Sequence, residues 1–192
     1  MKFFIGDKEQ RLSRRLCNGE SAARQEFYNL YADYLSAICA RYVADEDDLK
    51  DVFQDCMVSI LTGIGRFEYR GAGSLQAWAT RVAVNQALTY LKTKKKNEML
   101  LLDGDVAADA DDDISEPPPI SNVPPEELHR MVSQLPTGYR TVLNLYVFEN
   151  KSHKEIAQLL GIKADTSASQ LHRAKHQLAK MIKEYNSKRQ PR

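Results

Sequence analysis

The chain has 192 residues, 43% of them hydrophobic and 28% charged, with a formal net charge of +1. This composition supplies enough apolar material for a core, which excludes wholesale disorder, and no run approaches the roughly 20 apolar residues of a membrane span. The charge is segregated, with +3 in residues 1–96, −10 in residues 97–127 and +8 in residues 128–192, a pattern that indicates a polyanionic partner, most often nucleic acid.

The N-terminal segment returns to charged residues after a few apolar ones, which is too short for a secretory signal, so a cytoplasmic location is expected. Three cysteines, Cys17, Cys39 and Cys56, stand far apart and are odd in number. This pattern favours reduced side chains packed in helices over a disulfide framework or a zinc site.

Apolar residues at helical spacing predict a bundle of about four helices at the front of the chain. The stripes lie at Leu12 and Leu16, in residues 27–38 and in residues 49–61, and the fourth helix is expected from an N-cap at Ser74 to about Thr93.

The third of these helices carries an acidic face opposite its apolar stripe. Asp51, Gln54 and Asp55 stand at i, i+3 and i+4 and so lie together, which suits a basic protein surface. A plain solvated face is one alternative. A magnesium site is another, because the run Asp47-Asp48-Leu49-Lys50-Asp51 has DDxxD spacing, although no second acidic motif accompanies it.

Aromatic and arginine side chains alternate in the glycine-bounded segment 65–73. Unstacked bases stack on aromatic rings and arginines hold phosphates, so Tyr69 and Arg70 indicate a nucleic-acid contact. Trp78 either joins that contact or packs inward, and packing is the favoured alternative for a lone tryptophan. One face of the following helix continues the pattern with Trp78, Arg81, Asn85, Thr89 and Lys92, before the basic run Lys94, Lys95 and Lys96.

The acidic segment 97–125 contains five prolines and has no sustained apolar periodicity, so it is predicted to be a linker. It separates a domain at 1–96 from a domain at 126–185, which a basic tail at 186–192 follows. The expected fold class is all-α, with two small helical bundles joined by an acidic, proline-rich linker.

The second domain contains a helix-turn-helix pattern. Ser152 and Glu155 form a capping box, and Gly161 can stop the helix in a left-handed conformation. The next helix would enter the DNA major groove by its N-terminal end, where Thr166, Ser169, Gln170 and Arg173 are expected to face outward. A plain helical hairpin with solvated charges is the alternative.

Together these motifs make the chain resemble an RNA polymerase sigma factor of the sigma-70 family, in its extracytoplasmic-function (ECF) group. The first domain resembles sigma region 2, and the second resembles sigma region 4. The matching segments are Asp47–Asp55, Tyr69-Arg70-Gly71, Trp78 and Arg81–Asn85 in the first domain, and Leu135-Pro136, Tyr139-Arg140, Ser152–Ala157, Leu160–Ile162 and Leu171–Lys175 in the second.

The resemblance implies a transcription initiation factor that binds core RNA polymerase, directs it to promoters and assists DNA melting. It places Asp51, Gln54 and Asp55 on the polymerase, and a cognate anti-sigma factor is a further expected partner. It implies no catalytic residues, metal, cofactor or small-molecule substrate. The implied promoter contacts are Tyr69, Arg70, Trp78, Arg81, Asn85 and Lys92 for the −10 element, and Thr166, Ser169, Gln170 and Arg173 for the −35 element.

The sequence departs from many family members in the recognition helix, where Ser167 replaces a branched apolar residue and Ala168 and Gln170 replace basic ones. Two other functions remain open: a stand-alone helix-turn-helix regulator, and a magnesium-dependent enzyme built on the acids of residues 47–55.

Overall fold

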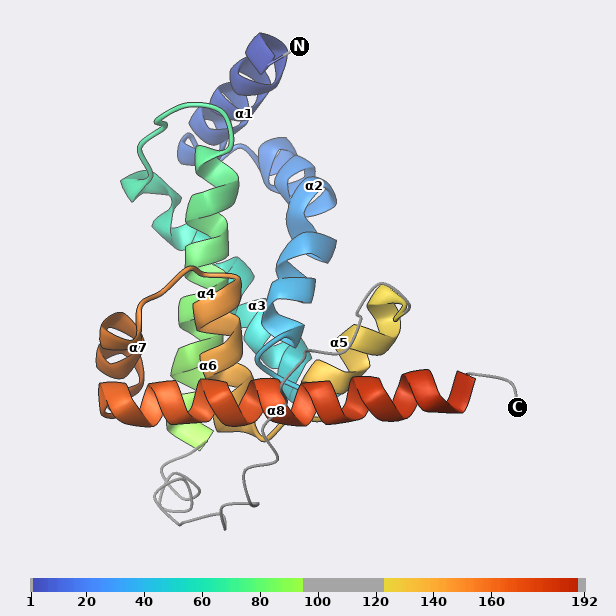
Figure 1. Ribbon diagram of the computed structural model, residues 1–192. Coiled ribbons are helices and arrows are strands. Elements are labelled where there is room, and N and C mark those ends of the chain that lie inside the picture. Colours follow the sequence, from blue (N-terminus) through green and yellow to red (C-terminus); the bar gives the residue numbers. More distant parts are fainter. Residues whose placement is uncertain (1, 95–122, 190–192) are drawn as a thin grey trace. The chain divides into compact units, whose positions relative to one another are not determined.

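The computed structural model describes residues 2–94 and 123–189, with side chains described for residues 8–94 and 123–188. The described residues form eight α-helices, one 3-10 helix and no strand (Figure 1), which confirms the all-α prediction. They divide into two compact units, one on each side of the boundary between residues 94 and 95, which hold residues 2–94 and 123–189 of the described ranges. Most of the predicted linker, together with Lys95, Lys96 and the end of the predicted tail, lies outside the described residues. No helix in the described ranges is long and apolar enough to cross a bilayer.

The first unit contains four helices and a short 3-10 turn. These elements are α1 (Lys2–Cys17), α2 (Ser21–Ala40), α3 (Glu46–Gly63), η1 (Ile64–Arg66) and α4 (Ser74–Lys94). Helices α2, α3 and α4 pack on one another, while α1 contacts α2 and η1 (Figure 1). The predicted stripe at 49–61 faces this core, since Val52, Cys56 and Ile60 are buried. Burial of such side chains is the main stabilising term of a small bundle.

The cysteines of the first unit differ in environment. Cys39 of α2 and Cys56 of α3 are fully buried and share a hydrogen bond, which lowers the pKa of the Cys39 thiol and raises that of Cys56. Cys17 is exposed, contrary to the prediction of a packed side chain, and its thiol donates to the Ile64 carbonyl oxygen at 3.3 Å. All three are free thiols.

The second unit contains α5 (Pro125–Ser133), α6 (Thr137–Val147), α7 (His153–Leu160) and α8 (Ala164–Arg189). The predicted capping box of Ser152 and Glu155 is present at the start of α7, and Gly161 ends that helix with φ of 70°. Helices α7 and α8 therefore form the predicted helix-turn-helix. Helix α5 packs on the C-terminal half of α8 around Met131 and Ile182.

A buried arginine connects two helices of the second unit. The Arg140 Nη1 donates to the Ser133 carbonyl oxygen at 2.6 Å, so a side chain of α6 satisfies the last carbonyl of α5. Burial lowers the pKa of the guanidinium. Arg140 is thus a structural residue of the α5–α6 turn.

Candidate nucleic-acid and protein interfaces

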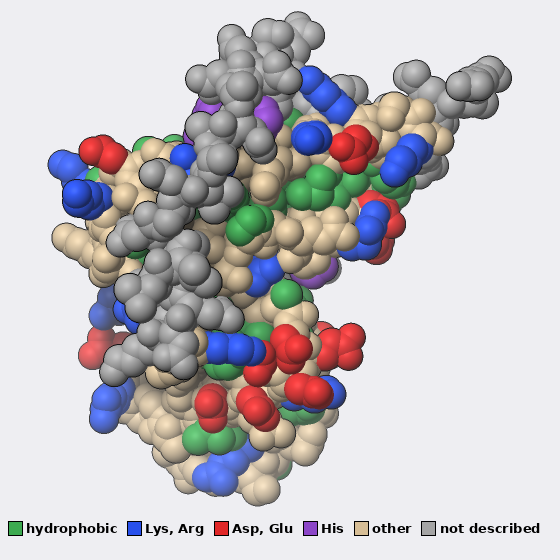
Figure 2. Space-filling view, turned by 90° about the horizontal axis from the view of Figure 1, so that it is seen from below, with side chains coloured by type: hydrophobic (Ala, Val, Ile, Leu, Met, Phe, Trp, Pro, Cys, Tyr) green, Lys and Arg blue, Asp and Glu red, His purple; other side chains and the backbone are tan. Residues whose placement is uncertain are grey.

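The predicted polymerase-facing residues form an exposed stripe on α3. Asp51, Gln54 and Asp55 are all exposed, on the side opposite the buried Val52 and Cys56. Val58 continues this stripe at i+3 from Asp55 and is 60% exposed, an apolar residue that the sequence analysis did not select. The space-filling view shows acidic side chains gathered on one part of the surface (Figure 2). An apolar side chain bordered by carboxylates and an amide is suited to contact a protein surface.

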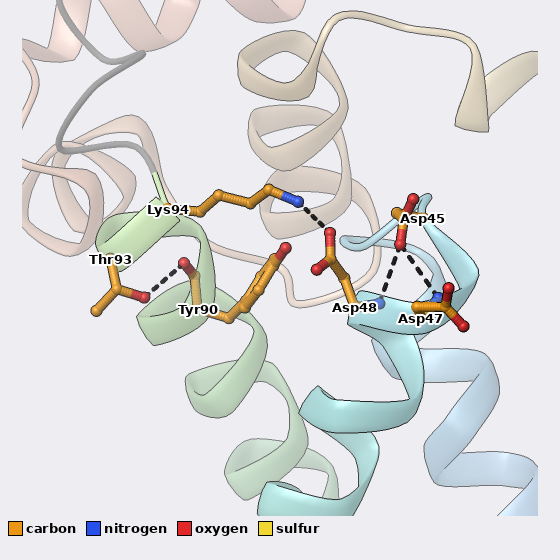
Figure 3. A network of polar contacts seen from close by, with 6 residues as sticks. All are labelled: Asp45, Asp47, Asp48, Tyr90, Thr93 and Lys94. Atoms are coloured by element: carbon orange, nitrogen blue, oxygen red, sulfur yellow. Dashed lines mark hydrogen bonds and ion pairs between the residues drawn. The ribbon is translucent and has the colours of Figure 1, made fainter.

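The neighbouring acids are occupied by local contacts. The Asp45 carboxylate accepts the Asp47 and Asp48 backbone N–H groups at 3.1 and 3.0 Å and so caps α3. Asp48 pairs with Lys94 at the end of α4, which lowers the pKa of the Asp48 carboxyl (Figure 3). Asp47 pairs with Lys50 at 2.9 Å. Among the described residues, no three His, Cys, Asp or Glu side chains are grouped to hold a metal ion.

The loop between η1 and α4 presents Tyr69 and Arg70. Tyr69 is half-buried, while Arg70 is exposed and pairs with the Glu68 carboxylate at 3.2 Å. Such an exposed pair contributes little to stability, so the guanidinium can exchange Glu68 for a phosphate at small cost. Gly71 and Gly73 have φ of 123° and 85°, which only glycine adopts without strain, and they set the return of the chain into α4.

The predicted N-cap at Ser74 is wrong. Ser74 is the first residue of α4, and its hydroxyl donates to the Gly71 carbonyl at 2.6 Å and accepts the Arg70 N–H at 3.2 Å. The N–H groups of Gly73, just before α4, and of Leu75 and Gln76 in its first turn instead donate to the buried carboxylate of Glu9 in α1, a residue that the sequence analysis missed.

Trp78 packs against the loop. Its ring centroid lies 5.4 Å from that of Phe67, and a side chain added at Gly63 would meet its indole at 3.6 Å. The indole is half-buried. This agrees with the inward-packing alternative and makes Trp78 a support for the loop beside Tyr69.

The exposed face of α4 carries the remaining residues predicted at the −10 element. Arg81, Asn85, Thr89 and Lys92 are all exposed. They lie at i, i+4, i+8 and i+11, so they share one side of the helix. The described residues thus present one run of cationic and amide donors that leads away from the loop.

The structure divides the four residues predicted at the −35 element. Ser169 and Arg173 are exposed and Thr166 is half-buried, but Gln170 is only 6% exposed. The prediction that Gln170 faces outward is therefore wrong. Ser167, Gln170, Leu171 and Ala174 stand at i, i+3, i+4 and i+7 and form the inward face of α8.

His172 takes the exposed place that was assigned to Gln170. Ala168, Ser169, His172 and Arg173 are exposed at i, i+1, i+4 and i+5, so they form one outward strip. Extending the apolar stripe of α8 back by one turn, from Leu171 to Ser167, would have shown from the sequence that these residues form the outward strip. Lys163 and Lys175 are exposed near the same end of the helix, which adds positive charge suited to phosphates.

Comparison with known families gives two matches in this chain. Residues 27–97 match the family described as Sigma-70 region 2, and residues 125–178 match Sigma-70, region 4. The chain is similar to the RNA polymerase sigma-H factor of Pseudomonas aeruginosa, at 24% identity over 92% of this chain and 94% of that protein. It is also similar to the ECF RNA polymerase sigma factor SigW of Bacillus subtilis (24%, covering 89% and 95%) and to the ECF RNA polymerase sigma-E factor of Haemophilus influenzae (26%, covering 91% and 95%).

Two solved structures are similar to this chain over most of its length. One is CnrH in complex with the cytosolic domain of CnrY, with 18% identity and a TM-score of 0.48, covering 90% of this chain and 96% of that one. The other is the sigma factor RpoE in complex with the anti-sigma factor NepR from Bartonella quintana, with 17% identity and a TM-score of 0.48, covering 83% and 96%.

Proposed function

Since this chain belongs to the ECF group of the sigma-70 family, we propose that it is a transcription initiation factor that binds core RNA polymerase and directs it to promoters. One observation carries the proposal: a region 2 match and a region 4 match occur in this order in a single chain. A stand-alone regulator would need only the helix-turn-helix.

Polymerase binding is assigned to the exposed stripe of α3. Asp51, Gln54 and Asp55 would contact a basic surface of the polymerase, and Val58 would fill an apolar site at its edge. The support is their shared exposure on one helix face. Carboxylates of this kind speed and orient association with a positively charged partner.

Recognition of the −10 element is assigned to the loop at 67–73 and to α4. Tyr69 would capture an unstacked base, and the stacking energy would offset the cost of unpairing it. Arg70 would bind a phosphate, while Trp78 would hold the loop through Phe67. Arg81, Asn85 and Lys92 would contact the strand along the exposed face of α4.

Recognition of the −35 element is assigned to the exposed strip of α8. Arg173 can donate to a base edge or a phosphate, as can His172 when its ring carries a proton facing the DNA. The Ser169 hydroxyl donates to the Asp165 carbonyl oxygen at 2.9 Å and keeps its lone pairs for the groove. Thr166 would contact the DNA backbone, and Gln170 would support α8 by packing on its buried side.

The further partner is an anti-sigma factor that covers the polymerase-binding surface. Its support is membership of the ECF group, together with the exposed Val58 at the edge of that surface. The protein would act in the cytoplasm, where the polymerase is, and would catalyse no reaction itself.

In vitro transcription with purified core enzyme tests the proposal. The chain should give transcripts from its own promoters only when core enzyme is present. A gel shift separates the alternatives, because a stand-alone regulator binds duplex DNA tightly without polymerase and this chain should not. Failure to associate with core enzyme would overturn the proposal. Tight magnesium binding by calorimetry would instead favour the enzyme hypothesis.

A further inference from the structure

A buried carboxylate of α1 receives three backbone N–H groups at the start of α4. The Glu9 Oε2 accepts the Gly73 N–H at 2.5 Å, and the Oε1 accepts those of Leu75 and Gln76 at 2.8 and 3.1 Å. Glu9 is only 7% exposed. One side chain thus satisfies three donors that the helix itself leaves without partners.

In the described part of the chain, no other side chain caps these groups. Gly73 has no side chain, and the Ser74 hydroxyl is engaged by Arg70 and Gly71. A negative charge at a helix N-terminus is favourable, because the N–H groups there carry partial positive charge. The Glu9 carboxylate therefore supplies from α1 what the local sequence of α4 lacks.

The same contacts fix one end of the loop that carries Tyr69. The Gly73 N–H donates to the Glu9 carboxylate. The two hydrogen bonds of the Ser74 hydroxyl hold Arg70 and Gly71, which come just before Gly73 in the chain. Helix α1 also contacts η1, which precedes the loop, since the Cys17 thiol donates to the Ile64 carbonyl. Helix α1 therefore contacts the chain on both sides of the segment assigned to base capture.

We propose that Glu9 is a positioning residue for promoter opening: by holding the start of α4, it fixes the loop in which Tyr69 captures a base. The inference rests on the proposed function. It goes beyond the family match, which begins at residue 27 and so does not include α1.

The first test measures the contact itself. Amide hydrogen exchange of the full chain should be faster at residues 73, 75 and 76 in the Glu9→Ala variant, by about tenfold or more, since hydrogen bonds to a charged group contribute roughly 1.5–3 kcal/mol. Glu9→Gln keeps the side-chain volume and should give a smaller increase. Ser13→Ala is the matched control, because Ser13 is buried on the same helix and its hydroxyl donates within α1, to the Gln10 carbonyl oxygen. Unchanged exchange in both Glu9 variants would overturn the proposal.

The second test measures the function with reconstituted holoenzyme. Glu9→Ala and Glu9→Gln should slow open-complex formation on a duplex promoter, by about tenfold for Glu9→Ala, with core-enzyme affinity unchanged. A promoter with a pre-melted −10 element should restore most of the rate, which a misfolded chain would not allow. Faster amide exchange with a normal rate of promoter opening would show that Glu9 caps α4 but would overturn its positioning role. A wild-type chain that opens no promoter would instead overturn the proposed function, and this role with it.

Discussion

His153 and Ser167 join the two helices of the helix-turn-helix, with the imidazole Nδ1 3.0 Å from the serine Oγ. Ser167 is fully buried. The imidazole also stacks on the Tyr146 ring at 5.0 Å between centroids, so residues of α6, α7 and α8 meet at one point. Whichever of the two atoms donates, the bond fixes the angle at which α8 leaves the turn.

Ser167→Ala should therefore lower the stability of the chain, whereas Ser169→Ala should not. The first change removes a buried hydrogen bond and should lower the free energy of unfolding by about 1 kcal/mol. The second removes an exposed hydroxyl two residues away on the same helix. Denaturant unfolding measures both, and equal effects would contradict the structural role of the His153–Ser167 bond.

Reversing the charges of Asp51 and Asp55 to arginine should weaken core-enzyme binding by about a hundredfold or more, because it places like charges against a basic partner. The helical circular dichroism signal should not change, since both residues are exposed. Reversing Glu126 and Glu184, which are exposed in the other unit, is the matched control for net charge. Fluorescence titration with core enzyme measures the affinities, and a comparable loss in the control would refute a specific contact on α3.

Tyr69→Ala should allow polymerase and closed-promoter binding but impair opening. Loss of one stacked base, worth about 1–3 kcal/mol, should slow open-complex formation by roughly 5- to 150-fold. Tyr69→Phe keeps the ring and should open promoters nearly normally. Stopped-flow measurement of melting compares the three proteins. Normal opening by the alanine variant would remove the base-capture role of Tyr69.

Arg173→Ala and Gln170→Met should differ in their effect on −35 preference. Arg173 is exposed, and its loss should cost about 1–3 kcal/mol and relax selectivity at the contacted base. Gln170 is buried, so a methionine of similar size should leave the preferred sequence unchanged. Competition binding of holoenzyme to promoter variants measures both. An altered base preference in Gln170→Met would place Gln170 in the groove after all.

The Asp48–Lys94 pair predicts a pH dependence. Lys94 lowers the pKa of the Asp48 carboxyl below its ordinary value. The pair therefore stabilises the folded unit above that ordinary pKa, and this contribution is lost as the pH falls through the lowered pKa. In Lys94→Met the Asp48 pKa should rise towards its ordinary value, as carboxyl NMR titration can measure. Lys50→Met removes only the Asp47 pair and should leave the Asp48 titration unchanged.

The parts of the fold that depend on nearby residues were predictable from the sequence. The stripe of α3 and the capping box of α7 involve partners within one or two helical turns, and both are present. Glu9 could not be identified in this way, because it lies 64 residues from Gly73 in the chain. Local preference favoured Ser74 as the cap, and a tertiary contact replaced it.

Buried polar side chains were the second source of error. Gln170 was expected outside because its amide can bind a base, yet its helical position places it with Leu171 and Ala174. Arg140 and Asn144 are buried in the same unit. A pattern based on hydrophobicity assigns such residues to the surface, and only the packed structure shows their inward direction.

The contrasting cysteines of the first unit provide an intrinsic reporter of its motions. A thiol-specific reagent can reach Cys17 directly, whereas Cys39 and Cys56 become accessible only when α2 and α3 part from each other. The slow phase of labelling would thus time the transient openings of the bundle. Any ligand that closes over this unit should lengthen the slow labelling phase. The measurement uses only the natural cysteines and needs no engineered probe.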